Sequence, residues 1–177
     1  AGHVGADTAG VILAEEPQNQ DSMTLLVDVG TNAEIVLGNR QRLLACSSPT
    51  GPAFEGAQIS CGQRAAAGAI ERVRIDTQTL QPRFKVIGSD LWSDEEGFAE
   101  AIQDHGVTGI CGSGIIEVVA EMYLAGIVTV DGIVDGALSS RSDLVIQNDR
   151  TWSYVLHRAE NDQVPIVVTQ NDIRQIQ

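Results

Sequence analysis

The order of apolar and polar positions predicts a helix followed by a small antiparallel sheet in the first part of the chain. Val4 to Glu16 mixes apolar with small residues and predicts a helix that packs closely on a neighbour. The largely apolar run Thr24–Val29 predicts a buried strand. Ala33–Leu37 and Arg42–Cys46 add two more strands, with Gly38-Asn39 as the expected hairpin turn between them. The three strands form a predicted meander.

The remainder of the chain predicts short strands separated by loops. Their expected positions are Ile70–Asp76, Arg83–Ile87, Val107–Ile110 and short segments near Val145, Val155 and Val167. Ser47 to Gly68 has no clear period and predicts a long ordered loop with one helical turn. Asp94 to Asp104 predicts an acidic, exposed helix or loop. Thr169 to Asp172 resembles a capping box and marks the start of a last helix.

One strongly apolar helix is expected between these strands. Ile115 to Ala125 has an apolar surface that only Glu117 and Glu121 interrupt, and these two residues lie four positions apart on one face. The helix is therefore predicted to be buried on most of its sides. Gly126 directly follows it and fits the glycine that commonly ends a helix. Strands and helices together predict a mixed α/β fold.

The charge balance narrows the classes of partner. The chain of 177 residues has 24 acidic and 11 basic residues, a formal net charge of −13, and a single lysine, Lys85. Nucleic acids and anionic membranes attract basic surfaces, so neither is an expected partner. No apolar run approaches the roughly 18 residues that a membrane helix needs. The hydrophobic content of 43% is sufficient for a sizeable core.

The cysteines and histidines do not form a metal-binding pattern. Cys46, Cys61 and Cys111 lie far apart in the sequence, with no C-x-x-C pair, so this chain is not expected to hold structural zinc or an iron–sulfur cluster. An odd number of separated cysteines indicates reduced thiols, as in a cytoplasmic protein. The three histidines are also isolated, and surface or helix-end positions are expected for His3, His105 and His157.

The sequence between the first two predicted strands carries candidate chemistry. Asp28 ends a strand, and Gly30, Thr31 and Asn32 follow in a tight turn. Glycine permits close approach of a ligand, the amides of Thr31 and Asn32 can form an anion-binding nest, and Asp28 can hold Mg²⁺ or its water shell. A phosphate-binding hairpin is therefore one interpretation. An ordinary hairpin with an Asx-type turn is the other.

Two further glycine-rich stretches are candidates. The amides of Gly112, Ser113 and Gly114 directly precede a predicted helix and can face an anion, but a tight strand–helix junction would need the same small residues. In the loop before them, Glu55 and Cys61 stay without an assigned role. Arg64 lies three positions after Cys61, and a nearby arginine can activate a thiol, although a buried inert cysteine is the commoner case.

Taken together, these stretches resemble one family, the C-terminal ATPase region of the ATP-dependent reductive activators of corrinoid proteins. The family pattern D-[IV]-G-T-N-G-E is similar to Asp28–Glu34. The patterns G-P-A-F-E-G-A-x-I-S-C-G-x-R-A-A and G-I-C-G-S-G are similar to Gly51–Ala66 and Gly109–Gly114. The opening Ala1–Asp7 and the closing Thr169–Arg174 are also similar, so the resemblance spans almost the whole chain.

The resemblance implies a fold and a site. These ferredoxin-like activators belong to the superfamily of sugar kinases, heat-shock chaperones and actin. Residues 1–177 would form an incomplete part of an actin-like ATPase domain, an α/β lobe of the ribonuclease-H type with an inserted β-rich part. Asp28 to Asn32 would be the second of the superfamily's two phosphate hairpins, with Asp28 positioning the Mg²⁺ of Mg-ATP as metal ligand and catalytic residue. Ala33 departs from the family, whose members usually have glycine there.

The resemblance also implies an activity and further parts. The family couples ATP to the one-electron reduction of cob(II)alamin to cob(I)alamin in a partner, a corrinoid protein or methyltransferase. The electron would enter through an N-terminal [2Fe–2S] domain. That domain, the first phosphate hairpin and the glycine-rich adenosine motif are not in this sequence. This chain alone is therefore expected to fold but to bind ATP weakly and to hydrolyse it negligibly.

Two other functions remain open at the level of sequence. The chain could belong to a small-molecule kinase or another ATPase of the same superfamily, which a pocket with convergent polar groups beside the hairpin would favour. It could instead be a non-enzymatic docking or dimerisation module, and a homodimer is among the candidate assemblies. A large exposed apolar surface would favour that interpretation.

Overall fold

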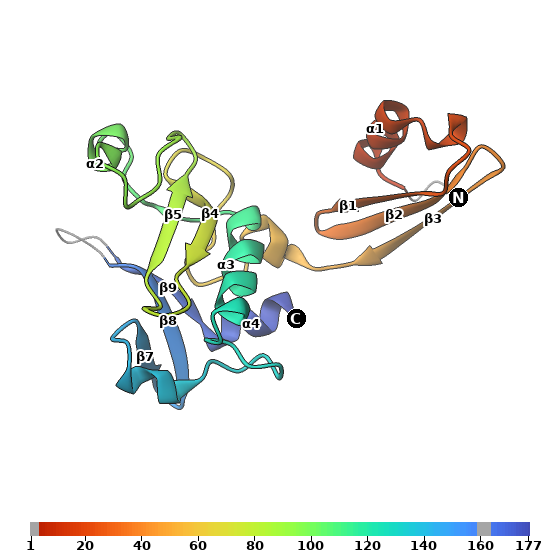
Figure 1. Cartoon of the computed structure of the whole chain (residues 1–177). Helices are drawn as coiled ribbons and strands as arrows, with labels where there is room; N and C mark the ends of the chain where they lie inside the picture. The colour runs from red at the N-terminus through yellow and green to blue at the C-terminus, as the bar shows by residue number, and fades with distance from the viewer. Residues whose placement is uncertain (1–3, 159–163) are drawn as a thin grey trace. The chain divides into compact units, whose positions relative to one another are not determined.

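The computed structural model describes residues 4–158 and 164–177 (Figure 1). His3 and the first residues of the opening motif lie outside these ranges. The chain divides into two compact units, Ala1–Pro52 and Ala53–Gln177. Each unit has its own sheet or sheets, so each is described by itself. In the described ranges, none of the helices combines the length and the apolar character needed to span a membrane.

The first unit is a helix on an antiparallel sheet. Helix α1 spans Ala6–Glu15, and a short 3₁₀ turn, Pro17–Asn19, follows it. Strands β1 (Thr24–Val29), β2 (Asn32–Asn39) and β3 (Arg42–Pro49) pair in the order β1-β2-β3. The predicted helix and the predicted meander are both confirmed, and β3 continues for three residues beyond the expected Cys46.

The expected burial of β1 is wrong on one face. Helix α1 packs on the face that carries Leu26 and Asp28, and its Thr8 is only 1% exposed. On the opposite face Leu25, Val27 and Val29 are 59%, 52% and 51% exposed. A largely apolar run of this kind is typical of a strand that is covered on both faces. Within this unit, only the α1 face of the strand is covered.

The turn between β2 and β3 lies two residues beyond its predicted position. Asn39 pairs with Arg42, so Arg40 and Gln41 form the two-residue turn. Asn39 accepts a hydrogen bond from the Gln41 amide at 3.0 Å, as asparagine often does at a turn. Gly38 lies within the strand instead, where a Cβ atom would collide with the backbone of Arg42. The glycine therefore serves packing between the strands and not the turn.

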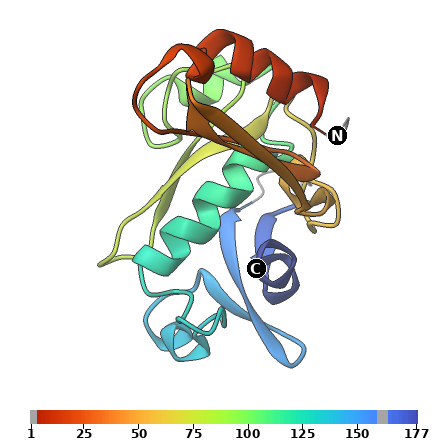
Figure 2. The same ribbon diagram turned by 90° about the vertical axis from the view of Figure 1, so that its right-hand side faces the viewer.

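The second unit contains two sheets that share one core. The elements in chain order are a 3₁₀ turn Pro52–Glu55, β4 Ala69–Ile75, β5 Pro82–Val86, α2 Phe98–Ala101, β6 Gly109–Ile110, α3 Gly112–Leu124, a 3₁₀ turn Gly136–Ser140, β7 Val145–Asn148, β8 Thr151–His157, β9 Ile166–Thr169 and α4 Gln170–Ile176. One sheet has the order β5-β4-β6 and the other the order β7-β8-β9. Helix α3 runs past both of them (Figures 1 and 2). All six predicted strand positions are confirmed.

The burial predicted for two segments differs from the structure. Helix α3 begins at Gly112, three residues earlier than expected, and its Ile116, Tyr123 and Leu124 are 44%, 52% and 70% exposed. The helix is therefore buried on one side and not on most sides. The acidic segment from Asp94 is largely loop with a single helical turn. It anchors itself through Phe98, which is buried, so it is not exposed throughout.

The long loop before β4 is ordered by contacts with distant elements. The backbone of Cys61 and Gln63 pairs with Ile110, so this segment extends the sheet beyond β6. The amide and hydroxyl of Ser60 donate to Asp172, which is fully buried. Asp172 also accepts from Thr169 and closes the capping box that was expected at the start of α4. The motif Gly51–Ala66 thus has a clear structural function, because it connects the sheet to the last helix.

Candidate functional site

The candidate phosphate hairpin is a tight loop whose carbonyl groups are fixed from one side. Val29 pairs with Ala33, and the Gly30 amide donates to the Asn32 carbonyl at 2.8 Å across the turn. The Thr50 hydroxyl donates to the Gly30 carbonyl at 2.5 Å. The amides of Thr50 and Gly51 both donate to the Thr31 carbonyl at 3.0 Å. The end of β3 therefore holds the turn carbonyls in place, which gives the loop a defined conformation before any ligand binds.

Asp28 lies opposite a second carboxylate. The register of β1 and β2 pairs Asp28 with Glu34, so both side chains lie on the face that α1 covers. Thr8 of α1 donates to Asp28 at 3.1 Å, and Ser47 of β3 donates to Glu34 at 3.0 Å. Within residues 4–158 and 164–177, neither carboxylate forms an ion pair with a basic side chain. Like charges placed directly opposite each other destabilise a sheet.

This pair of carboxylates fits the way proteins hold Mg²⁺. The ion is usually bound by one or two carboxylates, with phosphate oxygens and waters as the other ligands. Asp28 and Glu34 supply two carboxylates beside the turn, and a divalent cation would relieve their mutual repulsion. No group of three or more metal-ligating side chains exists in the described part of the chain. Two carboxylates leave the other ligand positions of Mg²⁺ to groups such as phosphate oxygens and waters.

Gly30 has no conformational reason of its own to be glycine. Its φ lies outside the left-handed region, and a Cβ atom added there would meet only the Asn32 carbonyl, at an ordinary 3.7 Å. A glycine that the backbone does not require leaves open space at the turn. Such space is what the close approach of a ligand would use.

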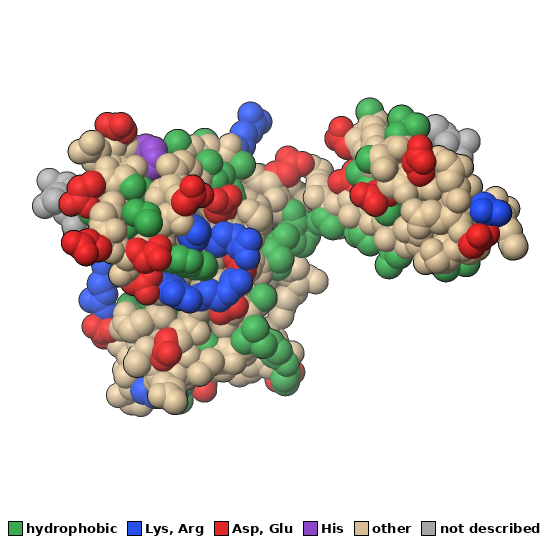
Figure 3. Space-filling view, turned by 45° about the horizontal axis from the view of Figure 1, so that its top comes forward, with side chains coloured by type: hydrophobic (Ala, Val, Ile, Leu, Met, Phe, Trp, Pro, Cys, Tyr) green, Lys and Arg blue, Asp and Glu red, His purple; other side chains and the backbone are tan. Residues whose placement is uncertain are grey.

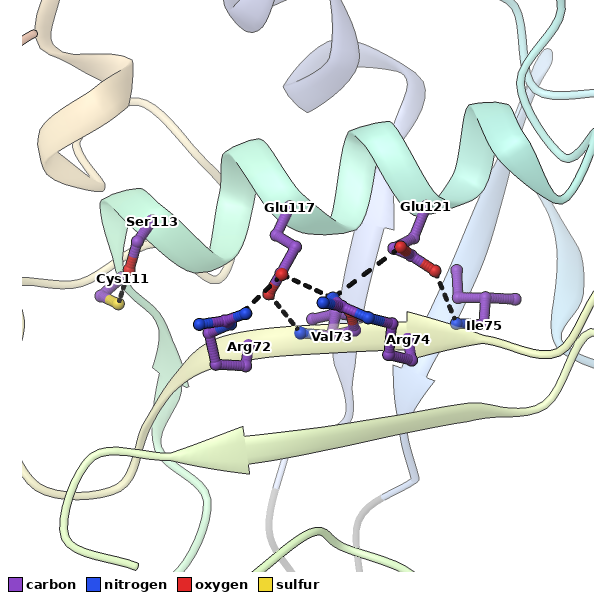
Figure 4. Close-up of polar contacts among 8 residues, drawn as sticks. All are labelled: Arg72, Val73, Arg74, Ile75, Cys111, Ser113, Glu117 and Glu121. Atoms are coloured by element: carbon purple, nitrogen blue, oxygen red, sulfur yellow. Dashed lines mark hydrogen bonds and ion pairs between the residues drawn. The ribbon is translucent and has the colours of Figure 1, made fainter. Parts of the chain in front are cut away.

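The glycines at the start of α3 have a different explanation. A Cβ atom on Gly112 would overlap the Phe54 carbonyl, and one on Gly114 would overlap the Ile70 carbonyl. Cys111 precedes the helix without a side-chain cap, and its buried thiol lies 3.3 Å from the exposed Ser113 hydroxyl (Figure 4). Close packing thus accounts for both glycines. An anion-binding role for Gly112, Ser113 and Gly114 stays a prediction.

The predicted site residues are divided between the two compact units. Asp28, Gly30, Thr31 and Asn32 share one hairpin in the first unit, whereas residues 112–114 belong to the second. Sequence reasoning left Glu34 and Thr50 without a role in the site. The signal for Glu34 was present, since Asp28 and Glu34 lie equally far on either side of Thr31 and so pair across a symmetric hairpin. Thr50 gave no such signal, because its contact depends on where β3 ends.

A second cluster of charged residues lies between β4 and α3 (Figure 4). Glu117 accepts from the Val73 amide at 2.7 Å, and Glu121 accepts from the Ile75 amide at 3.0 Å. These amides belong to the edge of β4 that pairs with β6 only as far as Ile70 and, among the described residues, has no strand beyond it. The two glutamates are therefore turned toward the sheet, and they satisfy donors that an open edge would otherwise leave unpaired.

Two arginines complete this cluster and set its electrostatics. The guanidinium of Arg74 lies 2.5 Å from Glu117, and that of Arg72 lies 3.2 Å from it. Burial on its own would raise the pKa of Glu117. The hydrogen bonds from Arg74 and from the Val73 amide outweigh burial and hold this pKa below its ordinary value. The cluster thus stabilises the contact between helix and sheet, and it has the character of a structural network.

Comparison with known proteins places these features in a family. Residues 22–177 match the model of the C-terminal domain of RACo, the ASKHA domain. Over 99% of its length the chain is 32% identical to the corrinoid activation enzyme RamQ of Eubacterium limosum, and over 71% it is 30% identical to the [Co(II) methylated amine-specific corrinoid protein] reductase of Methanosarcina barkeri. A solved structure, a reductive activator for corrinoid,iron-sulfur protein, covers 98% of the chain with a TM-score of 0.79 and 34% identity.

The chain spans only about a quarter of these proteins, namely 28% and 24% of the two relatives and 25% of the solved structure. The mixed α/β fold class expected from the sequence is confirmed by the family match and by the structural match. The match extends over both units and includes the hairpin as well as the start of α3. The chain belongs to the family of C-terminal RACo domains, which are domains of the ASKHA type.

Proposed function

We propose that this chain is part of an ATP-dependent reductive activator that returns the cob(II)alamin of a corrinoid protein to cob(I)alamin. The observation that carries the proposal is the ordered hairpin with its two opposed carboxylates, found in a chain of the RACo family. The names of the relatives indicate the substrate class, because one is a corrinoid activation enzyme and the other is a corrinoid protein reductase. A corrinoid protein or a corrinoid-dependent methyltransferase is therefore the proposed partner.

The hairpin residues have distinct proposed roles in binding Mg-ATP. Asp28, with Glu34 opposite it, would hold Mg²⁺, while Gly30, Thr31 and Asn32 would face the phosphate oxygens. The metal ion, when bound, neutralises charge on the phosphate groups. Because Thr50 and Gly51 fix the turn carbonyls, the loop would not need to reorganise on binding. The amides of Gly112, Ser113 and Gly114 remain the proposed second anion contact.

The proposal requires parts beyond this chain. Residues 1–177 would supply one phosphate hairpin of a longer cytoplasmic protein. The N-terminal [2Fe–2S] domain, the first phosphate hairpin and the adenosine motif would lie in the remainder. Hydrolysis would favour one arrangement of the lobes over another, since a ligand shifts an equilibrium only when it binds the two states differently. In this way ATP would drive an otherwise unfavourable electron transfer to the corrinoid.

The test is a pair of matched substitutions in the full-length protein. Asp28→Asn keeps an oxygen that can accept from Thr8 but removes the charge that would hold Mg²⁺. Asp21→Asn makes the same change at an exposed residue that pairs with Arg40. We expect Asp28→Asn to lower Mg-ATP turnover and the rate of cob(I)alamin formation, followed by absorbance, about 10²-fold, while Asp21→Asn has little effect. Equal rates for the two variants would refute the role of Asp28.

One observation also favours a docking or dimerisation function. The uncovered face of the β1-β2-β3 sheet exposes five large apolar side chains, Leu25, Val27, Val29, Leu37 and Leu44. An antiparallel sheet can leave one face to solvent, but that face is then usually polar, so this apolar surface is suited to bind another segment or a second copy of the chain. Light scattering of the wild type and of Val27→Asp tests for a second copy of the chain, because a dimer that forms through this face would dissociate in the variant.

The small-molecule kinase alternative gains no comparable support. Three hollows of about 640, 820 and 570 Å³ lie among the described residues of the second unit, whereas the hairpin belongs to the first, so none of the three supports this interpretation. The kinase interpretation would have been favoured by convergent polar groups beside residues 28–32. The reductive activator therefore stands as the better supported proposal.

A further inference from the structure

Four basic side chains lie together on the β4–β5 hairpin. The register places Arg72 opposite Lys85 and Arg74 opposite Arg83. These are four of only 11 basic residues in a chain with a net charge of −13, and they include its single lysine. Like charges directly opposite each other on a sheet are unfavourable. The arrangement thus has a cost for folding, and Figure 3 shows Lys and Arg side chains gathered on the surface, bordered by Asp and Glu.

A tryptophan lies among these charges. The guanidinium of Arg83 lies 4.8 Å from the centre of the Trp92 ring, the Lys85 ammonium 5.4 Å and the Arg74 guanidinium 6.0 Å. Cations at such distances are attracted by the electron-rich face of an indole ring. Trp92 is partly buried, and part of its surface remains exposed to solvent. The cluster therefore combines positive charge with an accessible aromatic surface.

The fold accounts for only half of this cluster. Arg72 and Arg74 bind Glu117, which is 22% exposed and lies beneath them on α3. Arg83 has only a loose pairing with Asp94 at 3.9 Å, and both side chains are more than half exposed. Lys85 donates to the Asp90 carbonyl, which leaves its charge uncompensated by that contact. Among the described residues, the loose pairing with Asp94 is thus the ion pair of the outer half, which is formed by Arg83, Lys85 and Trp92.

We propose that Arg83, Lys85 and Trp92 form a docking surface for an acidic segment of the corrinoid protein. Arginine and tryptophan are enriched at the energetically important centres of protein interfaces. Carboxylates of the partner would face Arg83 and Lys85, and an apolar side chain would cover the indole. The identity of the partner rests on the proposed function, whereas the chemistry of the segment follows from the surface itself.

A small polyanion or a nucleic acid fits this surface less well. The hollow of about 570 Å³ next to it is lined by Asp76, Asp94 and Glu121 as well as by Arg74 and Arg83, so a nucleotide placed there would meet three carboxylates. A nucleic acid would be repelled over a wider area by the net charge of −13. A protein surface can instead place carboxylates over the two outer cations and leave the acidic hollow uncovered.

The experiment is a charge reversal on the full-length protein. Arg83→Glu with Lys85→Glu places each new carboxylate opposite Arg74 or Arg72, which creates favourable cross-strand pairs. These pairs offset the loss of the contacts with Trp92 and Asp94, so the double variant should still fold, which its cooperative thermal unfolding would verify. The matched control reverses two exposed arginines of the first unit, Arg40→Glu with Arg42→Glu. Surface-immobilised corrinoid protein, the one that the wild type reduces, serves as the probe.

We expect the Arg83/Lys85 variant to bind the corrinoid protein about tenfold more weakly than the control variant at low salt. The difference should shrink as added salt screens the charges. Trp92→Ala should weaken binding at every salt concentration, because it removes an uncharged contact. Equal affinities of the two charge-reversed proteins would refute the docking surface while leaving the proposed function intact. Failure of the wild type to reduce any corrinoid protein would instead refute the proposed function, and with it this partner.

Discussion

At the scale of single residues, glycines in similar motifs occupy their positions for different physical reasons. Gly112 and Gly114 are required because carbonyl groups of other segments occupy the space of a side chain. A Cβ atom on Gly30 would meet only the Asn32 carbonyl, at an ordinary distance, and the φ of Gly30 lies outside the left-handed region. The sequence shows only that each motif is rich in glycine, since the atoms that approach each glycine come from segments far away in the chain. Once the atoms around each glycine are known, the effect of adding a side chain at each position can be predicted and tested.

We predict opposite results for alanine at two of these positions. Gly30→Ala should change the free energy of unfolding by less than about 1 kcal/mol, but it should weaken Mg-ATP binding in the full-length protein by crowding the phosphates. Gly112→Ala should lower the free energy of unfolding by about 1–3 kcal/mol, since the methyl group is forced against the Phe54 carbonyl. Urea denaturation and calorimetric titration measure both quantities.

The control for this experiment is Gly10→Ala in α1, where nothing lies within 4 Å of the added atom. It should leave binding unchanged. Binding by Gly30→Ala that equals binding by Gly10→Ala would contradict the proposed approach of phosphate to the turn.

At the scale of elements, the sequence predicted positions well and exposure less well. The strands and α1 lie close to their expected places because alternation and turn residues are local signals. The prediction that α3 is buried on most of its sides was wrong, because Ile116, Tyr123 and Leu124 are exposed. The structure turns Glu117 and Glu121 toward β4, whose free edge has amides that need acceptors. An open strand edge is a property of the sheet, and no local pattern in the helix reveals it.

The contact between α3 and β4 should depend on pH through Glu117. Its pKa lies below the ordinary value, so the stabilisation is complete above the carboxyl pKa of the unfolded chain, about 4.3, and is lost as pH falls through the lower pKa of the folded state. Glu117→Gln should lower the free energy of unfolding by about 1–2 kcal/mol at pH 7. The difference from wild type should shrink toward pH 3. Urea denaturation at both pH values tests this expectation.

Glu100→Gln, which changes an exposed carboxylate of α2, is the control for the Glu117 variant. It should affect stability little at either pH. A Glu117→Gln deficit that persists unchanged at pH 3 would show that the lost stability is unrelated to ionisation of this residue.

At the scale of the whole molecule, the motifs predicted the family, but they could not show how the chain divides. The hairpin and the start of α3 are both parts of the family pattern, yet they belong to different compact units. The apolar surface on the β1-β2-β3 sheet was also not foreseen, because the same run of residues predicts a strand covered on two faces. Patterns within one segment describe that segment, whereas coverage depends on segments that are distant or lie in another chain.

The proposed function makes a prediction about this chain by itself. In a mechanism that closes two phosphate hairpins around the nucleotide, one hairpin supplies only part of the contacts and cannot exclude water from the reacting phosphate. Asp28 and Glu34 offer two carboxylates to Mg²⁺, and the remaining ligands would have to come from the nucleotide or from solvent. We therefore expect the 177-residue chain to fold, to bind Mg-ATP at least about tenfold more weakly than the full-length protein and to hydrolyse it negligibly. Calorimetric titration and a phosphate-release assay on both proteins measure this. Tight binding with steady hydrolysis by the chain alone would mean that it completes its site by itself or with a second copy, and the two-hairpin account would have to be abandoned.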